Sequence, residues 1–511
     1  MAQNSRTKNT ILNGVAGVLT QCVTLATTFA TRTIFIRELG IEYAGVQGVF
    51  SDILTILSFA ELGIGSAITY ALYKPIAEND NREIGKYMFA YKVIYRFIAL
   101  TVFLVGCSFI PFLHFIINGV PNIVEDIRLI YFLFVVQSAS SYLLIYKATF
   151  LTAAQKDYLV SKFKIITSIG IAIVQCLFLL LYHSFVIYLI FSILAALLQN
   201  YIIACIAERE YPILKDKCKI KLSKEERITL FSNVRALFLY KVSGVALNGT
   251  SSLITSIVVN TVTVGVLSNY KLLTNQLKGF LSQVFKATAA SIGNLAVTSS
   301  GENQHKVFQQ MLFICFLVYC ISSTILFTVV NPFMQLWLGQ RFVFDFSIVA
   351  VIVLDFFIEG MLSPISQFRT SNGLFVQGKY RPVIMAILNV IFSVWLGKKL
   401  GVAGIFLGII TARALTQLWF APWILYKYVF KRSIVSYFAI YLKYVFVALL
   451  CCSMSRLAIT AIGLASPICN VVIGGFLAII LSLGCIYVFF HRTEEYLYSI
   501  QLVKKIAKRK L

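Results

Sequence analysis

Apolar segments long enough to cross a membrane recur from one end of this chain to the other, and this repetition limits the possible folds most. A helix needs about 20 apolar residues to span the hydrocarbon core of a bilayer. Of the 511 residues, 59% are hydrophobic and only 13% are charged, whereas a soluble domain carries about 25% charged residues. The sequence therefore predicts an all-α polytopic membrane protein.

The apolar segments predict about fourteen transmembrane helices. No globular-sized polar segment separates them, although polar residues interrupt the seventh, eighth and tenth. In chain order the predicted helices are centred near Leu25, Leu57, Leu100, Phe134, Ile173, Leu194, Leu247, Phe280, Val318, Leu354, Leu388, Ile410, Ala448 and Ile479.

The basic residues that give the chain its net charge of +24 are unevenly distributed between the two predicted sides of the membrane. Cytoplasmic loops of membrane proteins collect Lys and Arg, and the basic clusters of this chain fall in loops that lie on one predicted side. We therefore expect a multi-pass protein of the cell membrane with both termini in the cytoplasm, and basic loops that contact anionic lipids and not nucleic acid. The main exceptions on the opposite side are Arg37, Arg341, Lys398 and Lys399.

Two pairs of similar segments indicate a weak internal repeat. "AGVQGVFSDILTI" from Ala44 and "VGVLSNYKLLTNQ" from Val264 correspond at an offset of 220 in residue number, which aligns Gly45 with Gly265. "FLTAAQKDY" from Phe150 and "FRTSNGLFV" from Phe368 correspond at an offset of 218. In membrane transporters such repeats locate the substrate site at the interface between the halves.

The repeat predicts two parallel lobes of six helices around a central cavity, plus two C-terminal helices. The expected division is an N-lobe at 1–207, a cytoplasmic linker at 208–227, a C-lobe at 228–430, and helices thirteen and fourteen with a basic cytoplasmic tail at 431–511.

The predicted transmembrane helices contain the basic residues Arg32, Lys241, Lys271 and Arg413, although a charge at the centre costs about 2.5–3.5 kcal/mol. Arg32 lies five residues inside Arg37, so its guanidinium either snorkels to the outer headgroups or faces the cavity. Lys241 lies near the midplane, about 15 Å from the cytoplasmic end of the seventh helix. Because the first and seventh helices correspond in the repeat, we expect Arg32 and Lys241 to face each other. Lys271 and Arg413 either join this cationic cavity or pair with an acid on a neighbouring helix.

Further polar residues accompany these cations. Asp355 and Glu359 are spaced i and i+4 on the tenth helix and share one face. They are the obvious acids for such a pair, and they are also candidates for coupling transport to a cation. The amides predicted to line the cavity, or alternatively to hold helices together by hydrogen bonds, are Gln21, Asn248, Asn269 and Asn275.

The residue pattern favours a transporter over an enzyme. The four histidines are scattered, no acid, base and nucleophile cluster together, and the eleven cysteines lack metal-ligand spacing. We therefore expect no cofactor and no metal. Cations together with amides suit a ligand that combines phosphate oxygens with sugar hydroxyls. An organic cation would instead need unpaired acids and aromatic faces, and the first helix contains no acid.

Three segments carry a resemblance to a known family: "SRTKNTILNGVAGVLTQ", "RTIFIRELGIEYAGVQGVFSDILTILSFAELGIGSAITYALYKPIAENDNREI" and "HFIINGVPNI". They resemble the polysaccharide flippases of Gram-positive capsule and cell-wall glycan clusters, the Wzx-type branch of the multidrug, oligosaccharidyl-lipid and polysaccharide exporter superfamily. The similarity is strongest over residues 5–84. The run that contains Glu61, Gly63 and Gly65 is similar to the acidic-Leu-Gly pattern on the second helix of such flippases, where the glycines permit close packing or bending.

The resemblance implies alternating access that moves an undecaprenyl-diphosphate-linked oligosaccharide from the inner to the outer leaflet for surface polysaccharide assembly. It implies a diphosphate or acidic-sugar contact for Arg32, and it suggests a polysaccharide polymerase and glycosyltransferases as protein partners. Lys241 and Lys271 depart from the family pattern, because Lys binds phosphate as a point charge and not as a bidentate clamp. The alternatives are a multidrug cation antiporter, a flippase for the peptidoglycan precursor lipid II, and an assembly subunit without transport.

The predicted topology can be tested by cysteine labelling. In a cysteine-free variant, Lys217→Cys or a cysteine added at the C-terminus should stay unlabelled by an impermeant reagent on intact cells, because positive clusters set orientation. Both positions should label after the cells are opened. Labelling of either position on intact cells would contradict the cytoplasmic linker and tail.

Overall fold

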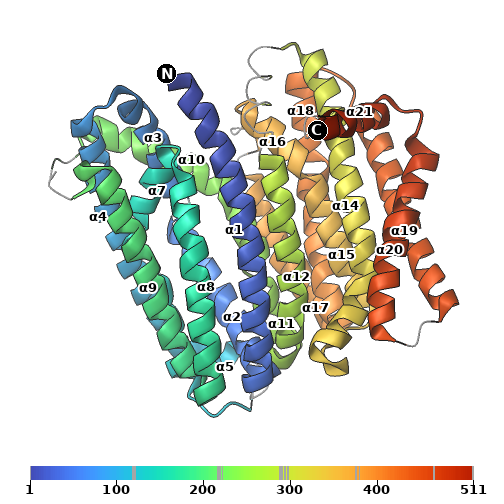
Figure 1. Cartoon of the computed structure of the whole chain (residues 1–511), viewed down its shortest axis with the longest axis horizontal. Coiled ribbons are helices and arrows are strands. Elements are labelled where there is room, and N and C mark those ends of the chain that lie inside the picture. The colour runs from blue at the N-terminus through green and yellow to red at the C-terminus, as the bar shows by residue number, and fades with distance from the viewer. Residues whose placement is uncertain are drawn as a thin grey trace. The chain divides into compact units, whose positions relative to one another are not determined.

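The structure is a computed structural model of the chain, and the residues that it describes form helices joined by short turns (Figure 1). The side chains of some helical residues, among them Lys241 and Asn248, lie outside the described part. The described residues are 2–61, 63–117, 122–215, 220, 222–286, 292, 295, 299–374, 377–378, 380–463 and 466–508.

The helices follow one another with few residues between them. Short 3-10 turns at Ser58–Glu61, Ile110–Phe112, Pro212–Leu214 and Gln340–Phe342 and π-helical turns at Ala414–Leu418 and Tyr426–Phe430 join some of them. The α-helices are α1 Ala2–Leu39, α2 Ile41–Leu57, α3 Ile64–Glu78, α4 Asn81–Ser108, α5 Leu113–Ile116, α6 Ile127–Ser141, α7 Ile145–Ala153, α8 Asp157–Tyr182, α9 Phe185–Glu210, α10 Lys224–Asn248, α11 Ser251–Val258, α12 Thr261–Lys286, α14 Gly301–Leu338, α15 Phe346–Met361, α16 Ser363–Ser371, α17 Arg381–Arg413, α18 Phe420–Leu425, α19 Val435–Ile462, α20 Pro467–Phe490 and α21 Glu494–Lys508.

The all-α polytopic fold is confirmed. Within the described residues, nine helical segments are long and apolar enough to cross a membrane, and the pair α6 and α7, bent by 41°, adds a tenth. Each of the fourteen predicted centres lies in a described helix, with Leu388 and Ile410 both in α17. The helices α10 and α12 are not among the nine, in agreement with the polar residues that interrupt the seventh and eighth predicted segments.

The long helix α17 is a pair of helices that folds back on itself at Gly401. The φ of Gly401 is 59° and its ψ is −138°, a conformation that favours glycine. Ser393 Oγ donates a hydrogen bond to the carbonyl of Ile405 at 3.1 Å, whereas twelve residues of continuous helix span about 18 Å. The halves are therefore side by side, and they correspond to the eleventh and twelfth predicted helices.

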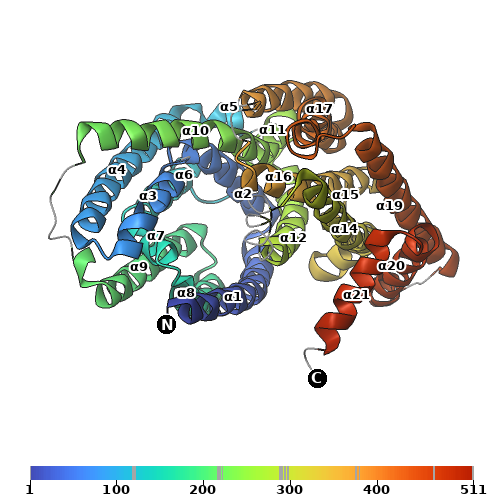
Figure 2. The same cartoon turned by 90° about the horizontal axis from the view of Figure 1, so that it is seen from above.

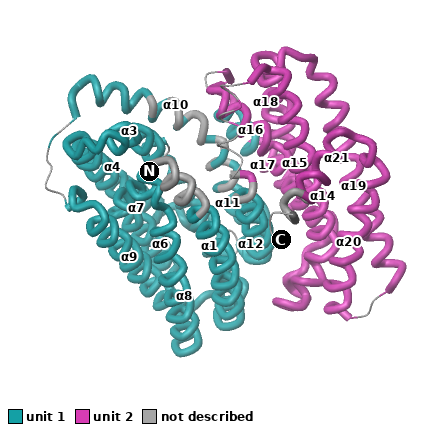
Figure 3. The backbone as a smooth tube through the Cα atoms, turned by 45° about the horizontal axis from the view of Figure 1, so that its top comes forward, with its two compact units in different colours: residues 1–283, 382–390 teal, residues 284–381, 391–511 magenta. Residues whose placement is uncertain are grey.

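The chain divides into two compact units, which Figure 3 colours teal and magenta. Unit 1 comprises Met1–Gln283 and Pro382–Val390, and unit 2 comprises Val284–Arg381 and Ile391–Leu511. Internal contacts thus group α10, α11 and α12 with the first nine helices. The division into lobes at 1–207 and 228–430 stays a prediction.

The helices of unit 1 form a ring. Packing contacts link α1 to α8, α8 to α9, α9 to α6, α6 to α2 and α2 back to α1, and Figure 2 shows these helices nearly end-on around a central space. In the same unit, α4 packs on α6, and α3 packs on α4 and α7. In unit 2, α14 is the central helix, because α15, α19, α20 and α21 all pack against it.

Two short helices confirm the repeat at an offset of 218. Adding 218 to the ends of α7, Ile145–Ala153, gives the ends of α16, Ser363–Ser371. Both helices end in the same way, because a residue with positive φ follows each at the same offset, Gln155 at 59° and Gly373 at 67°. The pairs of backbone hydrogen bonds around these two residues also correspond. The two sequence segments therefore encode one local structure.

A reciprocal glycine contact within unit 1 confirms the offset of 220. A Cβ at Gly45 on α2 would overlap the carbonyl oxygen of Thr261 on α12, and a Cβ at Gly265 on α12 would overlap the carbonyl oxygen of Ile41 on α2. The same offset relates Gly45 to Gly265 and Ile41 to Thr261. The two copies of the repeat therefore cross through equivalent residues, with backbone against backbone, where only glycine fits.

This crossing predicts a large effect from one methyl group. Gly45→Ala should lower the free energy of unfolding of the purified protein by about 1–3 kcal/mol, because overpacking forces the two helices apart. Its melting temperature should fall accordingly. Gly170→Ala on α8 is the matched control, since a Cβ at Gly170 meets no atom within 4 Å. The measurement is the melting temperature of both variants in detergent. Equal melting temperatures for Gly45→Ala and the unmodified protein would show that the helices do not approach so closely.

Candidate functional site

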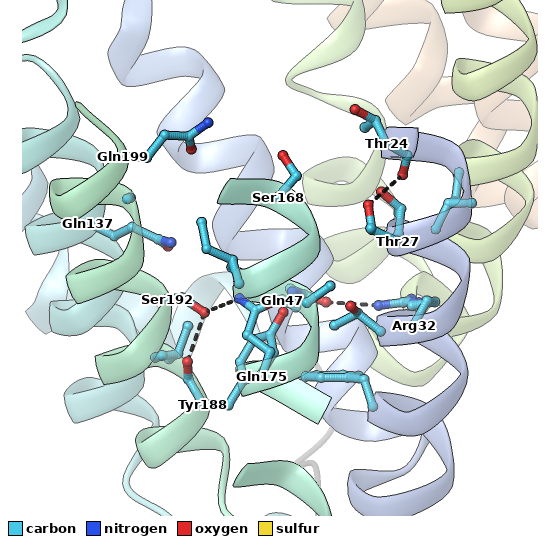
Figure 4. A pocket seen from close by; sticks show the side chains of 18 of the residues that line it. Thr24, Thr27, Arg32, Gln47, Gln137, Ser168, Gln175, Tyr188, Ser192 and Gln199 are labelled. Carbon is cyan, nitrogen blue, oxygen red and sulfur yellow. Dashed lines mark hydrogen bonds between the residues drawn. The ribbon is translucent and has the colours of Figure 1, made fainter. Parts of the chain in front are cut away.

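A polar cavity of about 490 Å³ lies inside the helix ring of unit 1 (Figure 4). Residues of α1, α2, α6, α8, α9 and α12 line it, and Arg32 is the one charged residue among the described lining residues. The remaining polar lining consists of neutral hydroxyls and amides, contributed by Thr24, Thr27, Thr28, Thr31, Gln47, Gln137, Ser168, Gln175, Tyr188, Ser192 and Gln199.

The helical period brings the polar groups of α1 to one face. Thr24, Thr27, Thr28 and Thr31 are spaced i, i+3, i+4 and i+7, which is one stripe of a 3.6-residue helix. Thr27 Oγ1 donates to the carbonyl of Val23 at 2.9 Å, so the hydroxyl hydrogen stays within the helix and the oxygen remains an acceptor. The stripe thus presents hydroxyl groups to the cavity beside Arg32.

The guanidinium of Arg32 is held between α2 and α12. Its Nε donates to Asn269 Oδ1 at 2.7 Å and its Nη1 donates to Gln47 Oε1 at 2.8 Å. Its Nη2 donates to Ser268 Oγ. These partners fix Arg32 in the cavity wall.

All three partners of Arg32 are neutral, and no ion pair to Arg32 occurs among the described residues. A guanidinium has five N–H donors, so two remain for a ligand. A cation inside a membrane helix requires a negative partner or water. The arrangement can therefore bind an anion without displacing a carboxylate.

The wall opposite Arg32 carries an amide and hydroxyl network (Figure 4). Gln175 Nε2 donates to Ser192 Oγ at 2.8 Å, and Ser192 Oγ donates to the carbonyl of Tyr188 at 2.7 Å. Gln137 and Gln199 line the same side. These groups both donate and accept hydrogen bonds, which suits a ligand with hydroxyl groups.

Lys271 is committed to a polar cluster of three helices. Its Nζ lies 3.3 Å from Asp52 Oδ1 on α2 and donates to Ser251 Oγ and Ser252 Oγ on α11, both at 2.9 Å. Asp52 Oδ2 accepts the backbone N–H of Ser252 at 2.6 Å, at the N-terminus of α11. The ion-pair alternative for Lys271 thus matches the geometry, with an acid that the sequence analysis did not single out.

Arg413 pairs in unit 2 with the two acids that were expected to be available for such a pair. Its Nη1 lies 2.8 Å from Asp355 Oδ1 and its Nη2 lies 3.7 Å from Glu359 Oε2. Arg413 and Asp355 are both buried. The charge of Arg413 is therefore compensated by these two carboxylates in the conformation described.

The remaining expected residues have different surroundings. Gln21 Nε2 on α1 donates to Gln276 Oε1 on α12 at 3.0 Å, which joins these helices near the cavity. Asn269 is fully buried beside Arg32, whereas Asn275 is exposed. The side chains of Lys241 and Asn248 lie outside the described residues, so their part in the site stays a prediction.

The acidic-Leu-Gly motif marks a break in the second predicted helix. The 3-10 turn Ser58–Glu61 follows α2, and Gly63 has φ 88° before α3 begins. Tyr95 OH on α4 donates to Glu61 Oε1 at 2.6 Å. A Cβ at Gly65 would lie 3.0 Å from the Tyr95 hydroxyl. The glycines thus serve bending at one position and close packing at the other.

The sequence analysis missed Gln47, Asp52 and Ser268, although a signal was present for each. Asp52 is the one acid in the apolar run of α2, and it is buried. Gln47 and Ser268 lie within the repeated segments, two residues after Gly45 and three residues after Gly265. Their roles depend on helix rotation, which the repeat alone does not define.

Comparison with known proteins establishes the fold. No protein-family model and no curated protein matches this chain. An inward-facing multidrug resistance MATE family transporter of the MOP superfamily superposes with a TM-score of 0.63 at 14% identity, over 81% of this chain and 99% of that chain. The lipid II flippase MurJ, in an inward closed conformation, superposes with a TM-score of 0.61 at 14% identity, over 94% of this chain and 99% of that chain.

A third structure extends the comparison to a different pocket chemistry. A MOP superfamily transporter from Pyrococcus furiosus, described as having a binding pocket of reverse polarity, has a TM-score of 0.55 at 13% identity, over 82% of this chain and 95% of that chain. All three structures are of transporters or flippases and none is of an enzyme. The chain therefore has the fold of MOP superfamily transporters.

Proposed function

We propose that this protein is a flippase that moves an undecaprenyl-diphosphate-linked oligosaccharide from the inner to the outer leaflet for surface polysaccharide assembly. The observation that carries the proposal is the cavity of unit 1, where an Arg32 without an acidic partner among the described residues faces neutral hydroxyls and amides. Alternating access of two lobes, with both termini in the cytoplasm, belongs to the same proposal.

Different groups of the cavity suit the diphosphate and the sugar of such a head group. The two remaining donors of Arg32 suit diphosphate oxygens, because a guanidinium binds phosphate through parallel N–H bonds. The threonine stripe and the glutamines suit sugar hydroxyls. A cavity of about 490 Å³ is within the usual range for small-ligand sites, so it suits the head group while the lipid tail stays in the bilayer.

Two rival functions occur among proteins with this fold. A multidrug cation antiporter would need unpaired acids together with aromatic faces, and the described lining of this cavity contains no Asp or Glu. A lipid II flippase would use the same cation and hydroxyl chemistry, and the fold of MurJ supports a lipid-linked substrate in general. We favour the polysaccharide precursor because of the family resemblance of residues 5–84. A polymerase and glycosyltransferases are proposed partners on the same ground.

The driving force that we propose is the membrane potential. An inside-negative potential favours outward movement of a diphosphate by about 2.3 kcal/mol per charge per 100 mV. Cation antiport through Asp355 or Glu359 is the alternative. In that case the ion pair with Arg413 must open before either acid takes up a cation, because Arg413 lies against both.

Arg32 provides the direct test of the cavity. Arg32→Gln should leave the protein inserted and abundant but reduce glycan export at least tenfold, because an amide cannot replace a charge-assisted phosphate contact worth about 1.5–3 kcal/mol. Arg32→Lys should restore part of the export as a point charge. The measurement is surface glycan per copy of flippase in a strain that lacks its own.

Arg37→Gln is the matched control, since Arg37 is exposed near the end of the same helix. It should keep full export. Normal export by the Arg32→Gln, Lys241→Gln double variant would contradict the cationic cavity and leave only the fold.

The driving force can be separated in proteoliposomes. With a potassium diffusion potential of about 100 mV set by valinomycin and no pH or sodium gradient, outward movement of fluorescent undecaprenyl diphosphate lipid should accelerate relative to zero potential. Asp355→Asn should keep this dependence on potential. Transport that ignores the potential and requires a proton or sodium gradient would instead support coupling through the acids.

A further inference from the structure

A second polar pocket, of about 590 Å³, lies in unit 1 between the break after α2 and the helices α3, α4 and α7. Glu61 lies in the break, and Tyr70 and Tyr73 on α3 and Tyr91 and Tyr95 on α4 line the pocket. Ser66 and Thr69 add hydroxyl groups from the same face of α3, at a spacing of i, i+3, i+4 and i+7 with the two tyrosines. The proposed function does not use this pocket.

The tyrosines of the pocket have two different surroundings. Tyr91 and Tyr95 are buried and pack edge to face with ring centroids 4.6 Å apart. Tyr70 and Tyr73 are 71% and 51% exposed, with ring centroids 6.3 Å apart at an interplanar angle of 76°. The buried pair thus forms the wall, whereas the exposed pair offers aromatic faces to a ligand.

Glu61 is built into this pocket and forms no ion pair among the described residues. It is half-buried, and one carboxylate oxygen accepts the hydroxyl of Tyr95 at 2.6 Å. The Tyr142 hydroxyl is a second hydrogen-bond partner of this carboxylate. A carboxylate has about four acceptor positions, so about two remain for a ligand. No Lys or Arg occurs among the described residues that line the pocket. The pocket therefore suits hydrogen-bond donors and repels phosphate.

We propose that this pocket binds uncharged sugar residues of the transported glycan; the proposal rests on the flippase function above. Aromatic rings present flat apolar faces that pack against the C–H face of a pyranose, and a carboxylate accepts hydrogen bonds from neighbouring sugar hydroxyls. The unit thus holds two pockets of opposite charge, one with Arg32 for the diphosphate and one with Glu61 for the sugar. An organic cation is the other chemistry that a carboxylate and aromatic rings attract, and the test distinguishes it.

The experiment measures binding of two lipids to the full-length protein in nanodiscs. The probes are undecaprenyl diphosphate and undecaprenyl diphosphate that carries a neutral linear glucose pentasaccharide, because Glu61 lies fourteen residues, or about 20 Å, along the chain from Gln47 beside Arg32. The unmodified protein should bind the pentasaccharide lipid roughly tenfold more tightly, because several hydrogen bonds to a charged acceptor are added. Glu61→Gln and Tyr70→Leu should each remove most of this gain and leave the affinity for the sugar-free lipid unchanged.

Two substitutions serve as controls. Glu61→Gln could disturb folding, because Glu61 accepts the hydrogen bond of the buried Tyr95. Tyr70→Leu tests the same pocket without this problem, since Tyr70 is 71% exposed. Tyr201→Leu on α9 is matched to it, because Tyr201 is 61% exposed in the same unit and does not line the pocket. Tyr201→Leu should keep the full gain.

Each of the other outcomes would contradict either the sugar site or the flippase function. An unmodified protein without the gain, or a gain that persists in both pocket variants, would refute the sugar site. Binding of tetraphenylphosphonium that is lost in Glu61→Gln would identify a cation site instead. Failure of the flippase function is seen separately, as sugar-free lipid binding that Arg32→Gln leaves unchanged.

Discussion

The crossing of α2 and α12 at Gly45 and Gly265 determines the geometry of the polar centre of unit 1. Because each glycine lies against a backbone carbonyl of the other helix, side chains within the next two turns come within reach of α1 and α11. Ser268 and Asn269 thereby meet Arg32 from one side, and Asp52 meets Lys271 and α11 from the other. A bulkier residue at the crossing would displace both polar clusters together.

The intramembrane cations divide by what neutralises them. Arg413 is buried against Asp355 and Glu359, and Lys271 is bound to Asp52 and two serines. Breaking such a pair leaves an uncompensated charge, which costs several kcal/mol in a buried site, so these pairs act as structural contacts in this conformation. Among the described residues, the hydrogen-bond partners of Arg32 are all neutral. Its charge is therefore the one best placed to act on a ligand.

The sequence was sufficient to predict what depends on periodicity and on copies of a segment. The fourteen helix centres and both repeat offsets follow from residue type and position. The structure shows the offset of 220 at Gly45 and Gly265, and the offset of 218 at α7 and α16. The partners of Arg32 and Lys271 were not predicted, because they depend on helix rotation and on a crossing between segments that are far apart in the sequence. The pocket of Glu61 was missed for a related reason, since its tyrosines come from α3 and α4.

The repeat also explains why the two copies treat their cations differently. Adding the offset of 220 to Arg32 gives Ser252, and not Lys241, so the arginine of α1 has a serine as its counterpart. At that point α1 is continuous, whereas the second copy is broken between α10 and α11 and Asp52 accepts the N–H of Ser252. The second copy thus uses Lys271 to hold a helix break together. The first copy needs no such contact, and this leaves the guanidinium of Arg32 turned to the cavity.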